Sequence, residues 1–567
     1  MSLLKKKGWI LVCLIGATLL YVSVAKKLYD IQIRGVASGI KNRTEFTKRL
    51  PARRGGIYDR NGREHPLAVS APCWRVFVDP EPIPANGHAE VIRELCQFSV
   101  FDADRVYTAV TRTSGRYHPI GETADRDIVN TIATNTVLRR CVGTNPITRR
   151  YYPMDRHMCH IVGAVNSHDE PLMGIEKTMD RYLTGTDGSI KGTASAKRRE
   201  IAAKREEKID PIHGDDVFLT LDRNIQYLVE NALDETMLKT QAQAGWIIVQ
   251  NPKTGEILAM ASRPNFSPDT FGSSLPTDQW NRAIFSVFEP GSTMKAVPFA
   301  AAVNEHLYTT NSLINVDNVL YAGRPLNDHV RGDITLTVAL QKSSNRASSR
   351  IAMGLGRETM EAYFRAFGFG SRTGIDLEGE GTGTLHPARA LSEIGAIRIA
   401  IGQGVAVTGI QMVSLYSTIA NNGIRMKPYV IQRVVAADGT VRLENTPTPL
   451  SRPITPATAA DTTFMLTHVT QKGGTGRRAA IPGYQVAGKT GTAQIPIAGG
   501  YSHTDYVGSF VGFFPADDPQ VTILVCLEAP KPLYQGGTVA APVFSELGAK
   551  IARYLEIPPD TPVPIIY

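Results

Sequence analysis

A run of eighteen uncharged residues near the start of the chain, residues 8–25, limits what the remainder can be. At about 1.5 Å per residue, a helix of this length measures roughly 27 Å, just enough to cross the hydrocarbon core of a membrane. A cleaved signal peptide has a shorter apolar region and a small-residue cleavage site, which residues 22–25 imitate only loosely. We therefore expect an uncleaved, single-pass transmembrane helix at 8–25, after a short tail at 1–7.

Lysines flank this segment on both sides, at 5–7 and 26–27. The positive-inside rule therefore favours a cytoplasmic N-terminus only weakly. No later stretch is as long and apolar. About 540 residues are expected on the far side of the membrane.

Composition excludes several classes of protein. The chain has 567 residues, of which 43% are hydrophobic, and ordinary Gly and Pro contents, so it is neither disordered, collagenous nor a polytopic membrane protein. Its length predicts more than one globular domain. The formal net charge is +9, but the excess lies within residues 1–215, and residues 216–567 are close to neutral. A nucleic-acid-binding function is therefore not predicted.

The residue composition and the hydrophobic pattern of the sequence change near residue 215. Residues 26–215 are rich in arginine and turns, with short apolar runs and helix-like pieces. Among them, residues 74–78 form an apolar run and 89–98 have a helical pattern. The charged run at 197–208 is expected to be a solvated helix or hairpin arm rather than a nucleic-acid site.

Residues 216–556 alternate between strand and helix patterns, which predicts an α+β or three-layer domain whose sheet joins distant parts of the chain. The last residues, 557–567, contain four prolines and are interpreted as a tail. The predicted elements are strands at 218–221, 508–514 and 521–528, a hairpin at 246–249 and 257–260, and helices at 224–240 and 541–555.

Cysteine and histidine give little sign of a disulfide framework or metal site. Outside the apolar segment there are five cysteines, at irregular spacing: Cys73, Cys96, Cys141, Cys159 and Cys526. One disulfide is compatible with an oxidising compartment. The segment 157–160, His-Met-Cys-His, lacks a second ligand pair at zinc spacing, so no metal and no cofactor is predicted.

A first candidate for chemistry is Ser292, followed three residues later by Lys295. Proline and glycine at 290–291 and the apolar run after Lys295 predict that a helix starts here, with the Ser292 hydroxyl at its positive end. Lys295 lies on the same helical face, and a buried lysine with a lowered pKa can take the proton of a serine nucleophile. Roughly two such Ser-x-x-Lys patterns are expected by chance in a chain this long.

Two further patterns follow in order. Ser343 and Asn345 flank Ser344, and a hydroxyl and an amide two residues apart could relay a proton and hold a substrate amide. Taken alone, however, this pattern favours a simple Ser/Asn cap or turn. Residues 489–492, Lys-Thr-Gly-Thr, suit an edge strand on which a peptide carboxylate can pair. About 0.2 Lys-Thr-Gly triplets are expected by chance.

Together and in this order, the three patterns resemble the active-site motifs of penicillin-binding proteins and serine β-lactamases. The stretches 217–266, 282–302, 333–347, 401–433 and 463–545 resemble a penicillin-binding transpeptidase domain throughout. This resemblance implies an antiparallel sheet flanked by helices plus an all-helical subdomain.

The N-terminal half refines the resemblance. Residues 54–62, Arg-Gly-Gly-Ile-Tyr-Asp-Arg-Asn-Gly, resemble the start of the pedestal domain of class B, the monofunctional transpeptidases, and residues 174–176 and 183–185 fit the same domain. No stretch resembles the glycosyltransferase of class A. Residues 288–293 look more like the division (septal) branch than the elongation branch. The implied domains are an elongated α+β pedestal, dimerisation-like domain at 26–215 and a penicillin-binding transpeptidase domain at 216–556.

The resemblance implies two-step acyl transfer on D-Ala-D-Ala stem peptides, with β-lactams as inhibitors. Ser292 would be the nucleophile, Lys295 its base, Ser343 the proton relay and Asn345 an orienting residue. Lys489 would supply positive potential, and Thr490, Gly491 and Thr492 would bind the substrate. Backbone N–H groups of Ser292 and Thr492 would form the oxyanion hole.

The resemblance also implies the bacterial inner membrane, with most of the chain on the periplasmic side, an amine acceptor strand, and partners that include a polytopic shape/division-family glycosyltransferase and other divisome proteins. Alternatives are an elongation-type transpeptidase, a D,D-carboxypeptidase or β-lactamase of the same fold, a non-enzymatic β-lactam sensor, and a structural divisome scaffold without catalysis.

Overall fold

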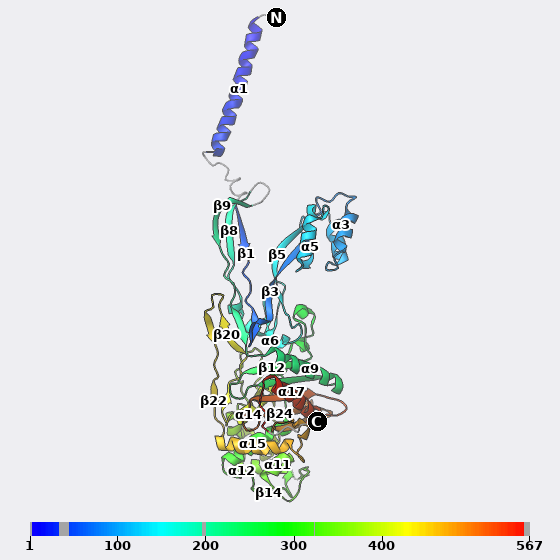
Figure 1. Cartoon of the computed structure of the whole chain (residues 1–567), viewed down its shortest axis with the longest axis vertical. Coiled ribbons are helices and arrows are strands. Elements are labelled where there is room, and N and C mark those ends of the chain that lie inside the picture. The colour runs from blue at the N-terminus through cyan, green and yellow to red at the C-terminus, as the bar shows by residue number, and fades with distance from the viewer. Residues whose placement is uncertain (1–2, 33–44, 195–199, 322–323, 561–567) are drawn as a thin grey trace. The chain divides into compact units, whose positions relative to one another are not determined.

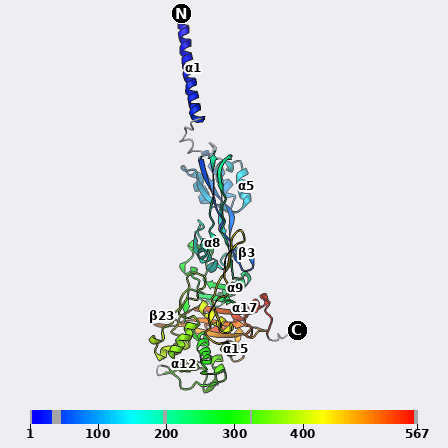
Figure 2. The same cartoon turned by 90° about the vertical axis from the view of Figure 1, so that its left-hand side faces the viewer.

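The computed structural model describes residues 3–32, 45–194, 200–321 and 324–560. These residues form two compact units, one made of 1–53 with 185–213 and the other of 54–184 with 214–567. Figures 1 and 2 show the chain in two views.

The first unit contains a long helix and a small sheet. Helix α1, Leu3–Gln32, extends beyond the predicted apolar segment at both ends. Within it, Gly8–Asp30 has a mean hydropathy of 2.1 and is long and apolar enough to cross a membrane. The three antiparallel strands of the sheet, in the order β1-β8-β9, are β1 Glu45–Leu50, β8 Gly188–Ala194 and β9 Glu200–Ile209. The predicted charged arm, from residue 200 onward, is therefore a strand of a hairpin, and its residues 197–199 lie outside the described residues.

The second unit begins with a seven-stranded sheet. The long strand β3, Gly62–Val78, pairs with β2, β4 and β5, and three short helices pack on its far end around buried residues such as Val76, Leu95 and Val106. The predicted helix at 89–98 is α3. The other elements here are β2 Ile57–Asp59, β4 His118–Thr123, β5 Val142–Tyr151, β10 Asp216–Leu219, β20 Ile431–Val435, β21 Val441–Glu444, α3 His88–Cys96, α4 Ala103–Thr111 and α5 Arg126–Thr134.

A cluster of buried salt bridges links the segment before β2 and strand β5 to the segment around Glu176. The Glu176 carboxylate is fully buried and accepts hydrogen bonds from Arg54 Nε at 2.7 Å and Arg150 Nε at 2.6 Å. Arg54 also contacts Asp180 at 2.6 Å. The Arg-Gly-Gly sequence at 54–56 is thus tied to the segment around Glu176, and both segments were singled out in the sequence.

A five-stranded antiparallel sheet, in the order β12-β11-β25-β24-β23, forms the centre of the rest of this unit. The predicted hairpin is β11 with β12, and the two predicted C-terminal strands are β24 and β25. β25 pairs with β11, so the sheet does join distant parts of the chain. The strands are β11 Ala244–Gln250, β12 Ile257–Arg263, β23 Ala487–Ile497, β24 Gly500–Phe514 and β25 Val521–Glu528.

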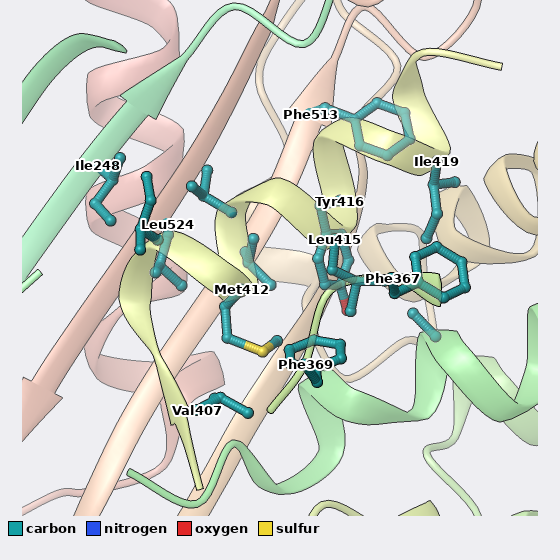
Figure 3. Close-up of a cluster of buried hydrophobic side chains, with 14 of the residues drawn as sticks. Ile248, Phe367, Phe369, Val407, Met412, Leu415, Tyr416, Ile419, Phe513 and Leu524 are labelled. Carbon is teal, nitrogen blue, oxygen red and sulfur yellow. The ribbon is translucent and has the colours of Figure 1, made fainter. Parts of the chain in front are cut away.

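Helices cover both faces of this sheet because its central strands are apolar on both sides. Along β11, Ile247 and Val249 pack with α9 and α17, whereas Trp246 and Ile248 face the larger helical layer, as the alternation of side chains requires. Helix α14 lies in that layer, and Figure 3 shows its Met412, Leu415, Tyr416 and Ile419 packed among strand residues and the side chains of Phe367 and Phe369.

The helices that cover the sheet include both predicted ones, α9 and α17. They are α9 Arg223–Thr240, α10 Ala296–Asn304, α11 Leu336–Gln341, α12 Asn345–Ala366, α13 Glu393–Ala400, α14 Gly409–Ala420, α15 Pro456–Thr470, α16 Gly536–Val539 and α17 Ala541–Tyr554. The first part of the predicted tail is attached to this unit, because Ile557 is buried and the Asp560 carboxylate accepts from Gln485 N at 2.8 Å. Residues 561–567 lie outside the described residues.

The six cysteines are free thiols, so the disulfide that the sequence left open is not formed. Cys159 and His160 are buried, and His160 Nε2 contacts the carbonyl oxygen of Asp278 at 2.8 Å. Across the described part of the chain, no group of three or more His, Cys, Asp or Glu side chains could hold a metal ion.

Candidate active site

Ser292 lies in a tight turn that leads into helix α10. The 3-10 turn Gly291–Lys295 precedes Ala296–Asn304. A helical turn therefore does start at Ser292 as predicted, but it is a 3-10 turn, and the α-helix begins only at Ala296. Gly291 has a φ of +54° and donates its N–H to Gly402 O at 3.0 Å. Thr293 Oγ1 donates to Pro290 O, and the buried Tyr416 hydroxyl donates to Thr293 O, each at 2.8 Å. These bonds fix the turn and the direction of the Ser292 side chain.

Lys295 is fully buried behind this serine. Its Nζ donates to Ser343 O at 2.6 Å, Ser343 Oγ at 3.2 Å and Asn345 Oδ1 at 2.6 Å. Burial disfavours the ammonium form and lowers the pKa of Lys295 to about 7, although the carboxylate of Asp328 acts in the opposite direction. Near neutral pH, a large share of Lys295 is therefore a neutral amine able to accept a proton.

Ser343 and Asn345 belong to the junction between α11 and α12. Ser343 has a φ of +59°, which turns the chain so that both its carbonyl and its hydroxyl meet Lys295. Ser344 caps α12 by accepting from Ala347 N at 3.0 Å, so the cap predicted as an alternative is real but belongs to Ser344. The Ser344 hydroxyl also donates to Asp328 Oδ2 at 2.6 Å.

The Lys-Thr-Gly-Thr segment lies on β23, the edge strand of the central sheet, as predicted. Lys489 is fully buried, and its Nζ donates to Thr490 O at 3.3 Å and Thr490 Oγ1 at 3.4 Å. Burial, with a smaller effect from the nearby positive charge of Lys295, lowers the pKa of Lys489 well below its usual value. Two buried lysines therefore lie beside one another here.

Glycine is required at position 491 because β23 approaches its neighbours closely. A Cβ there would lie 2.3 Å from Ser509 Oγ and 2.8 Å from Pro290 O. The absence of a side chain thus lets the edge strand lie against the turn that carries Ser292. The Thr492 hydroxyl accepts from Gly536 N at 3.1 Å, which ties the strand to the first residue of the short helix α16.

The predicted residues meet at one cavity of about 770 Å³. Ser292, Ser343, Asn345, Thr490 and Thr492 line it. Lys295, Lys489 and Gly491 are not part of its lining and lie buried next to lining residues. Segments more than a hundred residues apart in the sequence thus converge on a single site.

The sequence reasoning missed several residues of this site. Thr475 Oγ1 accepts from Thr490 Oγ1 at 3.1 Å, and Lys342, Arg477 and Arg478 also line the cavity. The glycine-rich stretch 473–476 shortly before Lys489 is the one signal in the sequence that could have pointed to this loop. Asp328 is a second omission, because it is bound to the Ser344 hydroxyl and acts on the pKa of Lys295.

Comparison with known proteins places this geometry in a family. Residues 245–548 match the penicillin binding protein transpeptidase domain, and residues 49–219 match the penicillin-binding protein dimerisation domain.

Three relatives illustrate the match. The chain is 33% identical to Stage V sporulation protein D of Bacillus subtilis, over 88% of this chain and 78% of that protein. It is 29% identical to the peptidoglycan D,D-transpeptidase FtsI of Escherichia coli, over 89% and 84%. A crystal structure of penicillin binding protein 3 from Mycobacterium tuberculosis, complexed with aztreonam, aligns with a TM-score of 0.70 at 28% identity, over 91% of this chain and 99% of that one. The chain therefore belongs to the class B penicillin-binding proteins, the peptidoglycan D,D-transpeptidases.

Proposed function

We propose that Ser292 is the nucleophile of this transpeptidase and that the neutral Lys295 amine is its base. The observation that carries the proposal is the environment of Lys295: a buried amine, held by Ser343 and Asn345, with a pKa of about 7, three residues after a serine that lines the cavity. A serine hydroxyl becomes a useful nucleophile when a nearby base removes its proton. Burial supplies such a base at neutral pH without help from a metal ligand or histidine.

In the first step, Ser292 Oγ attacks the carbonyl carbon between the two terminal D-alanines of a donor stem peptide, and its proton passes to Lys295. Backbone N–H groups of Ser292 and Thr492 hold the oxyanion, an interaction worth a few kcal/mol in comparable sites. The C–N bond then breaks, and the proton returns through Ser343 to the leaving D-alanine. Lys489 and the hydroxyls of Thr490 and Thr492 bind the terminal carboxylate, which raises the charged fraction of Lys489 once substrate is bound.

In the second step, an amine of a neighbouring strand attacks the acyl-enzyme ester. Asn345, whose Oδ1 accepts from Lys295, keeps the base oriented in both steps. A β-lactam enters by the same first step, because its strained amide takes the place of the D-Ala-D-Ala bond.

Fluorescent penicillin tests this assignment. We expect the detergent-solubilised chain to form a stable covalent adduct that survives denaturing electrophoresis, and Ser292→Ala to form none. Ser273→Ala, an exposed serine outside the cavity, is the matched control and should label like the parent chain. An unlabelled parent chain, or a labelled Ser292→Ala variant, would contradict the nucleophile. Rapid loss of the label would favour a β-lactamase or carboxypeptidase instead.

We further propose that the enzyme acts at the division septum, anchored in the inner membrane with most of the chain on the periplasmic side. The sequence Phe-Glu-Pro-Gly-Ser-Thr at 288–293 supports the division branch, and the apolar stretch Gly8–Asp30 supports the anchor. A polytopic shape/division-family glycosyltransferase and other divisome proteins would be its partners. Depletion in the native host should give filaments, and round cells would indicate the elongation branch instead. Protease added outside the inner membrane should degrade most of the chain, and its protection would refute the orientation.

A further inference from the structure

One end of the β23–β24 hairpin extends past the rest of the central sheet. Along β24, pairing with β25 begins only at Val507. In the described part of the sheet, residues 500–505 have no strand partner other than β23, and Tyr501 lies opposite Pro496, four residues after Thr492. The end of the edge strand that follows Thr492 therefore depends for its position on contacts from outside the sheet.

The side chain of Tyr501 makes such a contact. Its hydroxyl donates to Glu289 Oε1 at 2.9 Å and accepts from Arg398 Nη2 at 2.7 Å. The guanidinium of Arg398, on α13, also lies 5.8 Å from the centre of the Tyr501 ring. Burial and the hydrogen bond to Glu289 raise the pKa of Tyr501, so the hydroxyl keeps the proton that it donates. A single hydroxyl thus joins the hairpin to α13 and to Glu289.

Glu289 lies three residues before Ser292, at the start of the turn that carries this serine. Its side chain is buried, and Oε1 also accepts from Gly404 N at 2.8 Å. Beside it, Gly291 N donates to Gly402 O at 3.0 Å. The segment 402–404 is therefore bound to the turn at two points, once through the backbone and once through the Glu289 carboxylate.

Glu289 and Arg398 do not form an ordinary ion pair. The Tyr501 hydroxyl lies between them, and within the described part of the chain Glu289 Oε2 and Arg398 Nε are buried without a hydrogen-bond partner. A carboxylate and a guanidinium in direct contact often form two parallel hydrogen bonds, and a buried charge without its partner costs stability. The arrangement is therefore poor as a stabilising ion pair, but it makes the position of Glu289 depend on the hairpin.

None of these three side chains lines the cavity, so they act through the segments to which they belong. The two backbone N–H groups assigned to the oxyanion belong to Ser292, in the turn, and to Thr492, on the edge strand. Turn and strand lie against one another where a Cβ on Gly491 would be 2.8 Å from Pro290 O. Glu289 continues into the turn along the chain and is bonded to the hairpin through its carboxylate, so it is connected to both oxyanion donors.

We propose that Glu289 is a positioning residue that keeps the Ser292 turn and the edge strand in the arrangement that the oxyanion requires. This inference rests on the proposed function, which assigns Ser292 as the nucleophile. The Tyr501 hydroxyl and Arg398 hold the carboxylate in place, and the three side chains act as one unit. Loss of the unit slows the step in which the oxyanion forms and leaves the first binding of the ligand unchanged, because a small displacement of the reacting groups is costly to the rate.

The assay separates binding from chemistry. The detergent-solubilised chain is mixed with fluorescent penicillin at increasing concentrations, and saturation of the labelling rate gives the dissociation constant of the first complex and the acylation rate constant. Tyr501→Phe removes one oxygen and keeps the ring that Arg398 contacts. We expect its acylation rate constant to fall roughly tenfold, the usual scale for a hydrogen bond to a charged group, and its dissociation constant to stay within about twofold.

A conservative variant tests whether Glu289 acts through its hydrogen bonds. Glu289→Ala removes both bonds and should also slow acylation roughly tenfold or more. Glu289→Gln keeps an oxygen that can accept from Tyr501 and Gly404, so it should retain about a third or more of the parent rate constant. Glu289→Ala with Tyr501→Phe should be no slower than Glu289→Ala alone, since both changes break the same linkage. Tyr107→Phe and Glu444→Gln alter exposed side chains outside the cavity and should match the parent chain.

The final extent of labelling reports the folded fraction of each variant, so a variant that fails to fold is not mistaken for a slow one. A parent rate constant in Tyr501→Phe, or a loss that lies in its dissociation constant instead, would overturn the positioning role. Equal losses in Glu289→Gln and Glu289→Ala would overturn it as well.

Hydrolysis of the acyl-enzyme gives a second check, because an oxyanion forms in that step too. Release of the label from Tyr501→Phe should be unchanged or slower than from the parent chain. Faster release would show a loosened site that admits water, and would overturn the proposal. A parent chain that is not labelled at Ser292 would instead contradict the proposed function, so the two failures are distinguishable.

Discussion

Replacing Asn345 by aspartate adds one negative charge next to the proposed base, Lys295, and hardly changes the shape of the side chain. Asn345 Oδ1 accepts from Lys295 Nζ at 2.6 Å, so the new carboxylate would lie in direct contact with the amine. An opposite charge at this range raises the pKa of a lysine by about 1–3 units. From a starting pKa of about 7, we take about 2 units as the expected rise, which corresponds to roughly 2.7 kcal/mol in favour of the ammonium.

The direction of the effect on catalysis follows from the protonation state that Lys295 must have to act as the base. Acylation needs the neutral amine, whose fraction grows with pH through the pKa of Lys295. The parent chain should therefore reach half of its maximal acylation rate near pH 7, and Asn345→Asp near pH 9. At pH 7 the variant should react about fiftyfold more slowly, because about half of Lys295 is neutral in the parent chain and only about 1% is neutral in the variant. At pH 9 or above, most of the difference should disappear.

The assay is the second-order rate of labelling by fluorescent penicillin between pH 5.5 and 10. Asn345→Ala is the matched control, because it removes the same hydrogen bond without adding charge and should not move the midpoint upward. A variant midpoint that coincides with that of the parent chain would refute the assignment of Lys295 as the neutral base. A uniform loss of rate at all pH values would show that Asn345 acts through geometry alone.

Three further perturbations test the scaffold and the site. Gly402→Ala would place a Cβ 1.9 Å from Gly291 O, at a residue whose φ is +80°. The turn that carries Ser292 should therefore shift, and penicillin labelling should slow at least tenfold. An unchanged labelling rate would contradict this close packing. Glu176→Gln leaves Arg54 and Arg150 buried without the carboxylate that they share. Denaturant titration should show a free energy of unfolding lower by about 3–5 kcal/mol. A loss below about 1 kcal/mol would show that water replaces the carboxylate as the partner of the arginines. Thr475→Val removes the hydroxyl that Thr490 contacts at 3.1 Å and should slow penicillin acylation about tenfold, while the exposed Thr277→Val should have no effect.

Local patterns predicted the elements of the central sheet well, because apolar residues recur in those segments at the spacing that is typical of a buried strand or a buried helix. The hairpin β11–β12, the strands β24 and β25 and the helices α9 and α17 all lie where alternation and helical spacing placed them. The charged run from residue 200 was harder to assign, because a solvated segment has no apolar period, and it forms a strand paired with β8.

The site was predictable only where its chemistry is concentrated in short motifs. The residue types and spacing of Ser292, Lys295 and Lys489 are enough by themselves to indicate a nucleophile, a base and a positive charge. Thr475, Arg477 and Asp328 have no such signature, since their role depends on loops that approach the motifs only in the folded chain. The sequence analysis anticipated a lowered pKa for Lys295 but not for Lys489, whose pKa is lowered by complete burial among segments distant in the chain.

The strand order β12-β11-β25-β24-β23 also sets the timing of assembly. β11 is synthesised early, yet its second neighbour is β25, with Trp246 paired to Cys526 near the end of the chain. Proteins are made from the N-terminus, and a strand without its neighbour leaves unpaired backbone groups that invite wrong association. The edge strand with Lys489 reaches β11 only through β24 and β25. A chain cut short between residues 293 and 520 therefore has Ser292 but lacks β25, the strand that joins β24 and the edge strand to β11. Nascent or truncated copies are therefore expected to be inert toward penicillin and prone to aggregation, so penicillin labelling should report only chains whose synthesis is complete.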